Sequence, residues 1–415
     1  MRIVVVKFGG SSVATPERIK RVAERIVRTK DEGVSVVAVV SAMGDTTDDL
    51  LALARQITDR PPTRELDMLL ATGEQQSIAL LAMAIQALGQ PVISLTGAQG
   101  GITTDGVHTK AKIQAVNAER ILGELAEGRI VIVAGFQGVT EDDEITTLGR
   151  GGSDTTAVAL AAALQAERCE IFTDVDGVYT ADPRLVPAAR RLPAISYGEM
   201  LEMASSGAVV LQPRAVELAA QYGVVLEVRS SFNEHRGTLV REAGEMLEKE
   251  MYVSGVTHDT NVAKVVLIDV PDRPGVAHRI FSALARERIN VDMIVQSTKA
   301  EQTTDLLFTV SRDDLPRTAE VMEQVSRELG AKGILTDLSV AKVSVVGAGM
   351  VSNPGVAALM FEALAERGIN IQVISTSEIR ISCLIEAERI AEAANAIHAK
   401  FGLDRSALGE AVDLR

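Results

Sequence analysis

Apolar residues in the first half of the chain alternate between short continuous runs and helical spacing. The runs, which are typical of buried strands, fall at Ile3–Lys7, Val34–Ser41, Val92–Leu95, Ile130–Ala134 and Glu170–Thr173. Helical spacing predicts helices at Pro16–Lys30, Leu66–Leu88 and Thr155–Leu164. This alternation predicts an α/β fold whose mainly parallel sheet is covered by helices on both faces.

An internal repeat occupies the C-terminal part of the chain. Pro274-Gly275-Val276-Ala277 recurs 80 residues later as Pro354-Gly355-Val356-Ala357. Each copy has the pattern of a strand, a Pro-Gly loop, an amphipathic helix and a strand, which predicts two βαββ-type modules. We therefore expect a first domain at 1–235, a linker at 236–262 that includes the charged stretch Arg241–Glu250, and modules at 263–340 and 341–415. The pattern leaves open whether the modules exchange strands.

Composition narrows the class of protein. The 415 residues have a formal net charge of −14, so the surface would repel a phosphate backbone and nucleic acid is not expected as a partner. The N-terminus enters a strand at once, without a signal-peptide pattern, and no apolar run reaches the roughly 18 residues of a membrane span. Cys169 and Cys383 lie in apolar runs and are expected to be buried thiols. We expect a cytoplasmic protein that does not enter a membrane.

A glycine-rich turn follows the first predicted strand, in Lys7-Phe8-Gly9-Gly10-Ser11-Ser12. Backbone N–H groups and a helix N-terminus at such a turn favour an anion, and Lys7 would add a positive charge near a transferred phosphoryl group. An ordinary strand–turn–helix with an exposed lysine has the same pattern, so both interpretations stay open. No G-x-x-x-x-G-K-[ST] occurs, which excludes a P-loop of the Walker type.

A second glycine-rich turn lies in Thr146–Thr156, before the predicted helix of small residues. Gly151 and Gly152 allow close approach of the backbone to a ligand. The planar guanidinium of Arg150 is suited to clamp a carboxylate through two hydrogen bonds. A simple helix N-cap would explain Ser153 and the threonines but not Arg150.

Other polar residues follow apolar segments. The carboxylates of Thr173–Arg184 have the chemistry to orient a lysine or to hold Mg²⁺, and Arg184 could reach a nucleotide phosphate. Asp, Gly and Pro also dominate ordinary turns. Ser41, Thr47 and Glu74 end apolar segments, and for Glu74, at the start of a helix, a capping or dipole role is the default.

A possible dinucleotide-binding motif begins at Gly347-Ala348-Gly349, after an apolar run. Ser352 stands where the third glycine belongs, and the segment is part of the repeat and not of a full βαβ unit. A nicotinamide cofactor is therefore not expected.

Taken together, these segments resemble the aspartate kinase family. KFGGSSV (Lys7–Val13), TTLGRGGSDTTAVALAAAL (Thr146–Leu164) and TDVDGVYTADPR (Thr173–Arg184) match in the family's order and rough spacing, and the repeat is similar to tandem ACT domains. The resemblance implies a three-layer α/β/α sandwich with a mainly parallel sheet, followed by two βαββ-type ACT domains. It also implies ATP-dependent phosphorylation of the side-chain carboxylate of L-aspartate to 4-phospho-L-aspartate, with Mg²⁺ bound with ATP.

The resemblance implies roles for individual residues. Lys7 and Asp174 would be catalytic. Arg150 would bind the α-carboxylate of aspartate and Glu74 its ammonium group, and the expected substrate-binding residues are Ser41, Thr47, Glu74, Arg150, Gly151, Gly152 and Ser153. The expected ATP-binding residues are Lys7, Phe8, Gly9, Gly10, Thr173, Asp174, Tyr179, Asp182 and Arg184. No residue is firmly assigned to the metal ion.

The ACT pair implies feedback regulation by lysine, threonine or both. One effector site would include Asp272, Pro274, Gly275, Val276, Asn290, Val291, Asp292 and Gln296. The equivalent residues of the second repeat are Asn353, Pro354, Gly355, Val356, Asn370, Ile371 and Thr376. The family also implies a homo-oligomer, or assembly with a C-terminal fragment started internally near Met246 or Met251.

One position departs from the family pattern, and two alternatives stay open. Many relatives have a lysine in a Gly-Ala-Lys-Val segment, where this chain has Gly207-Ala208-Val209-Val210. The first alternative is a related kinase of acetylglutamate, glutamate or uridylate, although these generally lack tandem ACT domains. The second is a non-catalytic amino-acid sensor. Val209 favours it, and the presence of Lys7, Arg150 and Asp174 disfavours it.

Overall fold

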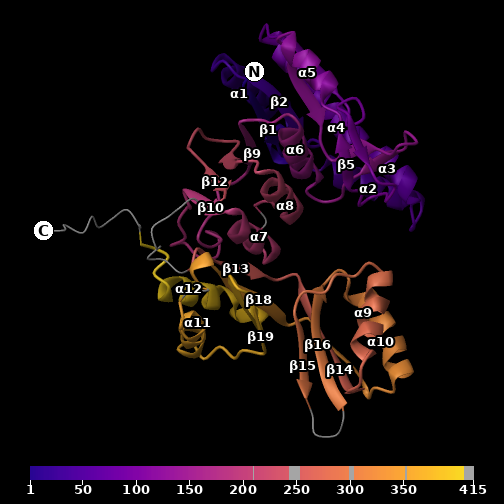
Figure 1. The fold of residues 1–415 in the computed structure, drawn as a ribbon, viewed down its shortest axis with the longest axis vertical. Coiled ribbons are helices and arrows are strands. Elements are labelled where there is room, and N and C mark those ends of the chain that lie inside the picture. Colours follow the sequence, from indigo (N-terminus) through magenta and orange to yellow (C-terminus); the bar gives the residue numbers. More distant parts are fainter. Residues whose placement is uncertain (209, 243–252, 299–302, 351–352, 406–415) are drawn as a thin grey trace, which may run out of the picture. The chain divides into compact units, whose positions relative to one another are not determined.

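A computed structural model describes residues 1–208, 210–242, 253–298, 303–350 and 353–405 (Figure 1). The described residues form two compact units. The first comprises residues 1–178, 191–204 and 210–242, and the second comprises 179–190, 205–208 and the described residues from 253 onward. The division does not follow chain order, because Tyr179–Arg190 belongs to the second unit while both of its flanks belong to the first.

The first unit is built on an eight-stranded sheet with the strand order β10-β12-β11-β9-β1-β2-β6-β3. Its strands are β1 (Ile3–Phe8), β2 (Ser35–Val40), β3 (Val92–Leu95), β6 (Ile130–Ala134), β9 (Arg168–Thr173), β10 (Ala194–Ser196), β11 (Leu226–Ser230) and β12 (Thr238–Arg241). All neighbours are parallel except β11 and β12. The central strands are Val- and Ile-rich and buried on both faces, as expected for a covered parallel sheet.

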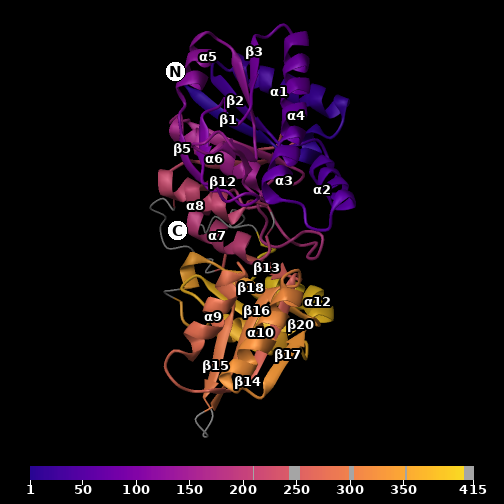
Figure 2. The same cartoon turned by 90° about the vertical axis from the view of Figure 1, so that its right-hand side faces the viewer.

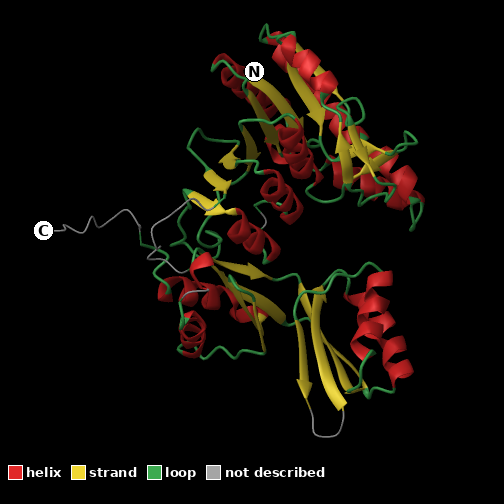
Figure 3. Cartoon of the chain, viewed as in Figure 1, coloured by secondary structure: helices red, strands yellow, loops and turns green. Residues whose placement is uncertain are grey.

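Helices cover both faces of this sheet. On one face α1 (Pro16–Asp31) and α4 (Thr72–Ala87) share a hydrophobic core with β1, β2 and β6. On the other face α6 (Gly152–Ala163) contacts β1, β2 and β9 and packs against α8 (Pro213–Tyr222). The resulting layers are visible in Figures 1 and 3. The predicted three-layer α/β/α arrangement is confirmed.

The first unit also contains a second sheet and four further helices among its described residues. A four-stranded sheet has the order β5-β4-β7-β8, formed by β4 (Ile102–Thr104), β5 (Ile113–Val116), β7 (Gln137–Val139) and β8 (Ile145–Thr147). The other helices are α2 (Thr46–Ile57), α3 (Thr63–Leu70), α5 (Glu119–Ala126) and α7 (Tyr197–Ser205), whose last residue lies in the second unit.

The predicted long helix at Leu66–Leu88 is present as α3 and α4, separated by Ala71. By length and composition alone the stretch Thr63–Ala87 is apolar enough to cross a membrane. However, α4 places Ile78, Leu81 and Ile85 in the core beside α1, and core helices of soluble proteins pass the same test. The stretch is therefore weak evidence for a membrane span.

The second unit contains two antiparallel sheets, shown from a second side in Figure 2. The first sheet, β15-β16-β14-β17, is formed by β14 (Val262–Pro271), β15 (Ile294–Thr298), β16 (Thr303–Ser311) and β17 (Gly333–Asp337), with α9 (Val276–Arg286) and α10 (Leu315–Leu329). The second sheet, β13-β18-β20-β19, is formed by β13 (Gly255–Asp259), β18 (Val340–Val346), β19 (Val373–Thr376) and β20 (Arg380–Glu386), with α11 (Val356–Ala365) and α12 (Ile390–Lys400). Because β18 pairs antiparallel on both sides, it does not belong to a dinucleotide-binding βαβ unit.

The range 236–262, which we expected to be a linker, contains strands of both units. β12 pairs with β10 and β11 in the eight-stranded sheet. β13 pairs with β18, with Gly255 opposite Val346 and Asp259 opposite Lys342. The sheet of the second repeat is therefore completed by a strand that precedes the first repeat in the sequence. The charged stretch at 241–250 gave no sign of this, and its residues 243–250 lie outside the described residues.

Candidate active site

The carboxyl ends of β1, β2 and β9 meet at one edge of the sheet. Phe8 lies opposite Val40 of β2 and Phe172 of β9, and its ring stacks on that of Phe172 with centroids 4.8 Å apart. The next residues of each strand are held by backbone hydrogen bonds, from Gly9 N–H to Phe172 O (3.3 Å) and from Ser41 N–H to Phe8 O (3.1 Å). The fold thus brings together three of the predicted segments, as expected for parallel strands.

The turn after β1 requires glycine at one position. A Cβ atom at Gly10 would lie 2.9 Å from the carbonyl oxygen of Ala42 and 3.0 Å from that of Gly44. Both atoms are backbone, and Gly44 N–H donates to Gly10 O (3.1 Å). The turn after β1 and the loop after β2 therefore touch through their backbones, which only glycine permits.

Lys7 is a buried cation at this edge. Its side chain is 11% exposed, and its Nζ lies 2.6 Å from Oδ1 of Asp154, which is 9% exposed and belongs to the first turn of α6. A lysine this far removed from water needs a nearby negative charge. We did not predict Asp154, although it directly follows the Gly-Gly-Ser of the second turn. A carboxylate beside the predicted site segments was the signal that could have identified it.

Glu74 is a second buried ionisable residue, and among the described residues only one of its oxygens has a partner. The residue is 2% exposed and lies in the first turn of α4. Its Oε1 accepts a hydrogen bond from Ala42 N–H (3.1 Å), whereas Oε2 is buried with no hydrogen-bond partner in the described part of the chain. Burial raises the pKa of Glu74 from 4.5 to about 7, against the opposing effect of its backbone hydrogen bonds. A helix-capping role for Glu74 would explain neither its burial nor the oxygen that lacks a partner among the described residues.

Two hydroxyl groups link these charges. Ser41 Oγ donates to Ser153 Oγ (2.9 Å). Ser41 is adjacent to Ala42, which binds Glu74, and Ser153 is adjacent to Asp154, which pairs with Lys7. A continuous set of contacts therefore joins Glu74 to Lys7 through the ends of β2 and α6. Thr47, in the first turn of α2, is half-buried.

Arg150 is exposed, and hydrogen bonds from other segments hold the loop that carries it. Arg214 of α8 donates to the carbonyl oxygens of Leu148 (3.1 Å) and Ala111 (2.8 Å). The fully buried Asp67 of α3 accepts from Thr147 Oγ1 (2.5 Å). Gly151, which follows Arg150, is the N-cap of α6 with φ +70°, a conformation that favours glycine. Sequence patterns did not identify Asp67 or Arg214, because each acts through residues distant in the chain.

The predicted ATP-binding residues divide between the two units. Thr173 and Asp174 lie at the end of β9 in the first unit, where Thr173 Oγ1 donates to Asp174 Oδ1 (3.1 Å) and Asp174 is exposed. Tyr179, Asp182 and Arg184 lie in the second unit. Arg184 binds Asp182 through Nε (3.0 Å) and Nη2 (2.8 Å), and its side chain is 89% exposed. Val209 lies outside the described residues.

The part of the chain that the structure describes has no preformed cluster of metal ligands. Among residues 1–208, 210–242, 253–298, 303–350 and 353–405 no group of three or more His, Cys, Asp or Glu side chains is arranged to hold a metal ion. Mg²⁺ is commonly bound by one or two carboxylates together with the phosphates of a nucleotide. The exposed carboxylate of Asp174 at the sheet edge could serve as such a ligand.

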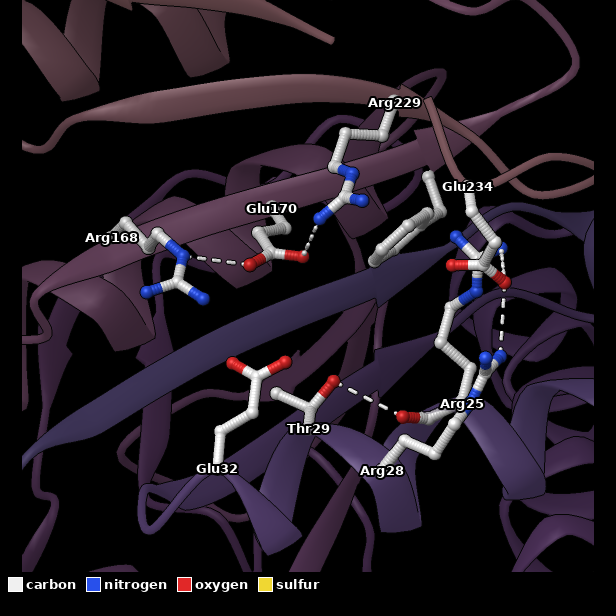
Figure 4. A pocket seen from close by; sticks show the side chains of 9 residues that line it. Arg25, Arg28, Thr29, Glu32, Arg168, Glu170, Arg229 and Glu234 are labelled. Atoms are coloured by element: carbon white, nitrogen blue, oxygen red, sulfur yellow. Dashed lines mark hydrogen bonds and ion pairs between the residues drawn. The ribbon is translucent and has the colours of Figure 1, made fainter. Parts of the chain in front are cut away.

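A separate polar cavity of about 190 Å³ lies on the α1 face of the sheet, and none of the predicted site residues lines it (Figure 4). Glu170 accepts from Arg168 (2.7 Å) and Arg229 (3.3 Å), and Glu234 accepts from Arg25 (2.9 Å) and Arg28 (2.9 Å). Because its arginines are largely matched by glutamates, we interpret this cluster as an ion-pair network that closes the sheet face, not as an anion site.

Five of the eight predicted effector residues of the first repeat line a cavity of about 350 Å³ at the start of α9. Its walls include Asp272, Pro274, Gly275, Val276 and Gln296. Gly275 is the N-cap of α9 with φ +93°, and Gln296 Nε2 donates to Asp272 Oδ1 (3.4 Å). The cavity therefore offers helix N–H groups beside a carboxylate.

The other predicted effector residues do not line this cavity. Asp292 pairs with the buried Lys342 of the second repeat, Val291 packs in the core of the first repeat, and Asn290 is exposed. In the second repeat Gly355 is again a left-handed N-cap (φ +107°), and Asn353 Nδ2 donates to Gly349 O (2.7 Å). The remaining residues there are the exposed Pro354, Asn370 and Thr376, the buried Val356 and the half-buried Ile371.

Comparison with known proteins agrees with this fold. The model of the amino acid kinase family matches residues 2–230, and two ACT domain models match residues 264–330 and 343–401. An aspartokinase of Mycolicibacterium smegmatis is 54% identical over 407 residues, 97% of each chain. Aspartokinase III of E. coli in complex with aspartate and ADP, in the R state, has a TM-score of 0.81 at 27% identity and covers 96% of this chain and 99% of its own. The same enzyme with lysine and aspartate, in the T state, has a TM-score of 0.75 at 27% identity, with the same coverage.

Replacing Glu74 by glutamine is expected to stabilise the protein above neutral pH. Between pH 4.5 and about 7 the folded protein keeps a proton on Glu74 that the unfolded chain has lost, so the contribution of this group to stability falls as pH rises. Glutamine does not ionise, so the Glu74→Gln variant does not lose stability in this way as pH rises. Its free energy of unfolding, measured with urea, should therefore exceed that of the wild type by about 3 kcal/mol at pH 8 and by little at pH 5. Glu141→Gln, at an exposed glutamate, is the control, and a wild type at least as stable as Glu74→Gln at pH 8 would contradict the assignment.

Proposed function

Because the chain belongs to the aspartokinases, a branch of the amino acid kinase family with C-terminal ACT domains, we propose that it transfers the γ-phosphoryl group of ATP to the side-chain carboxylate of L-aspartate. The product would be 4-phospho-L-aspartate. The observation that supports this substrate most directly is the buried oxygen of Glu74, which has no hydrogen-bond partner among the residues that the structure describes. A primary ammonium group would supply the missing charge and hydrogen bond.

The two ends of aspartate would be held by opposite charges. Glu74 would bind the ammonium group and Arg150 the α-carboxylate, with Ser41, Thr47 and the backbone of Gly151–Ser153 around them. This arrangement would leave the side-chain carboxylate directed to the phosphoryl group. A carboxylate is already a nucleophile, so no general base is needed and the enzyme acts mainly by positioning and by charge neutralisation.

Lys7 would neutralise charge that develops on the transferred group. Its pairing with Asp154 at 2.6 Å supports this role, because the pair keeps a buried ammonium at the sheet edge. The backbone at Phe8–Gly10 would approach the phosphates, and Thr173, Asp174, Tyr179, Asp182 and Arg184 would contact the nucleotide. Mg²⁺ would neutralise charge on the bound phosphates, and the exposed carboxylate of Asp174 is one candidate ligand.

We also propose that lysine, threonine or both inhibit through the ACT domains. The N-terminus of α9 would receive the α-carboxylate of the effector and Asp272 its ammonium group, in the cavity lined by Gly275 and Gln296. The lysine complex of the E. coli enzyme supports lysine as the first amino acid to test. The effect on activity must equal the difference in effector affinity between the active and inhibited states.

Two further predictions concern the whole protein, and one sequence difference concerns the nucleotide site. We expect a homo-oligomer, or assembly with a C-terminal fragment started internally near Met246 or Met251, both of which lie outside the described residues. We expect a cytoplasmic location. The Val209 position leaves one part of the nucleotide site without the lysine of many relatives.

Turnover of ATP with L-aspartate, with the acyl phosphate trapped by hydroxylamine, tests the reaction. Arg150→Ala should raise the KM for aspartate about 100-fold, because a charge-assisted carboxylate clamp is lost. Arg21→Ala, at an exposed arginine of α1, should leave that KM unchanged. Turnover with N-acetylglutamate, glutamate or UMP in place of aspartate would assign the chain to a sister kinase. If no acceptor supports ATP turnover while amino acids still bind, the chain would be a non-catalytic amino-acid sensor.

Inhibition curves for lysine, threonine and their mixture test the regulatory part. Asp272→Asn should raise the half-inhibitory concentration about ten-fold, because an ionic hydrogen bond to the effector becomes a neutral one. Asp313→Asn, at an exposed aspartate before α10, should match the wild type. If neither amino acid binds or changes the rate, the ACT pair does not serve as a lysine or threonine sensor.

A further inference from the structure

The segment Tyr179–Arg190, which we call the nucleotide segment, is folded as part of the second ACT domain. Its flanks stay in the first unit, where Leu192 N–H donates to Val178 O (2.8 Å). Two residues further along, Thr180 N–H donates to Arg190 O (2.8 Å). The segment therefore leaves the first unit as a closed loop whose interior residues take their contacts from the second.

The apolar side of the nucleotide segment is buried in the core of that domain. Ala181 is 4% exposed and Val186 is 1% exposed. Both belong to one hydrophobic cluster with Val256 of β13, Ile385 of β20 and Ile397 of α12. Moving the segment away would expose these side chains, so the domain core fixes where it lies.

Thr180 is the polar centre of this attachment. It is fully buried, its carbonyl oxygen accepts from Val256 N–H (2.7 Å) and its Oγ1 accepts from Arg190 N–H (2.9 Å). The same Oγ1 lies 2.9 Å from Nε2 of His398 on α12. Arg190 in turn donates through Nε to Leu403 O (3.1 Å), just beyond α12. One threonine thus joins both ends of the segment to β13 and α12.

His398 is suited to form a hydrogen bond with Thr180 in its uncharged form. It is 1% exposed, and burial lowers its pKa, with Asp404 opposing the shift and Arg190 adding to it. The imidazole is therefore uncharged at pH 7. A neutral imidazole that forms a hydrogen bond with the Thr180 hydroxyl can be buried without an unpaired charge.

We propose that Thr180 and His398 are positioning residues for the nucleotide, because they hold the nucleotide segment in the fold of the second ACT domain. This inference rests on the proposed function, in which Tyr179, Asp182 and Arg184 contact ATP. It goes beyond that function in assigning nucleotide affinity to a contact inside the regulatory domain. Loosening the contact weakens ATP binding and leaves aspartate binding and the chemical step unchanged.

The test is Thr180→Val in the full chain, which keeps the side-chain shape and removes the hydroxyl. The dissociation constant of ADP, measured by calorimetry without aspartate, should rise about five-fold, as expected for a lost buried hydrogen bond. The KM for ATP should rise by a similar factor, while kcat and the KM for aspartate change less than two-fold. Thr180→Ser should restore ADP affinity, and His398→Leu should weaken it as Thr180→Val does.

Thr318→Val is the matched control. Thr318 of α10 is also fully buried, and its hydroxyl donates to Asp314 O (2.8 Å) within the first repeat. The Thr318→Val variant should lose about as much thermal stability as Thr180→Val, without any change in ADP affinity. Equal ADP affinities in Thr180→Val and Thr318→Val would overturn the inference, as would a matching rise in the KM for aspartate. A wild type that binds ADP but does not phosphorylate aspartate would overturn only the proposed reaction.

Discussion

The burial of charge at the carboxyl edge of the large sheet is the constraint on which the site depends. β1 is buried along its whole length, and yet it carries Lys7. A charge removed from water is tolerated only beside an opposite charge or a ligand. Asp154 supplies the opposite charge for Lys7, whereas Glu74 has one oxygen with no counterpart among the described residues. The described chain thus holds a buried carboxyl group whose charged form a bound ammonium group would stabilise.

The remainder of the first unit serves to bring these charges to one place. Parallel pairing puts the ends of β1, β2 and β9 side by side, and Gly10 lets two loops touch through their backbones. The residues of α6 are small, so the helix lies close to the sheet and its first turn reaches Lys7. Preorganisation of this kind suits phosphoryl transfer, in which positioning and charge neutralisation contribute more than covalent chemistry.

The chain passes between the two units more than once, because residues 179–190 belong to the second unit while both flanks belong to the first. The nucleotide segment shares the core of the second ACT domain, and β13 completes the sheet of that domain before the first repeat begins. The two repeats also meet each other, since Lys342 of β18 is buried against Asp292 and Lys264 of β14 donates to Gln372 (2.5 Å). Asp292 and Gln372 are equivalent positions of the repeat. These reciprocal contacts mean that a shift in one repeat changes the surroundings of the other.

Much of the fold followed from local patterns, because strands buried on both faces and helices with one apolar stripe have clear periodicities. The strands around Lys7, Val37 and Ile132 and the helix at Pro16 were predicted on that basis. Contacts between distant segments have no such local signal. The pairing of Asp154 with Lys7, the support of Arg150 by Arg214 and the attachment of Thr180 to His398 each join residues brought together only by the tertiary structure. For the same reason the strand β13 was taken for part of a linker.

The most direct test of the central claim is the number of protons released when aspartate binds. Titration calorimetry in two buffers of different ionisation enthalpy gives this number. If the ammonium group of aspartate completes the buried carboxylate of Glu74, whose pKa is about 7 in the free protein, about 0.9 proton should be released at pH 6 and about 0.1 at pH 8. Binding without proton release at either pH would show that Glu74 is not the group that receives the substrate, and the account of the site would fail.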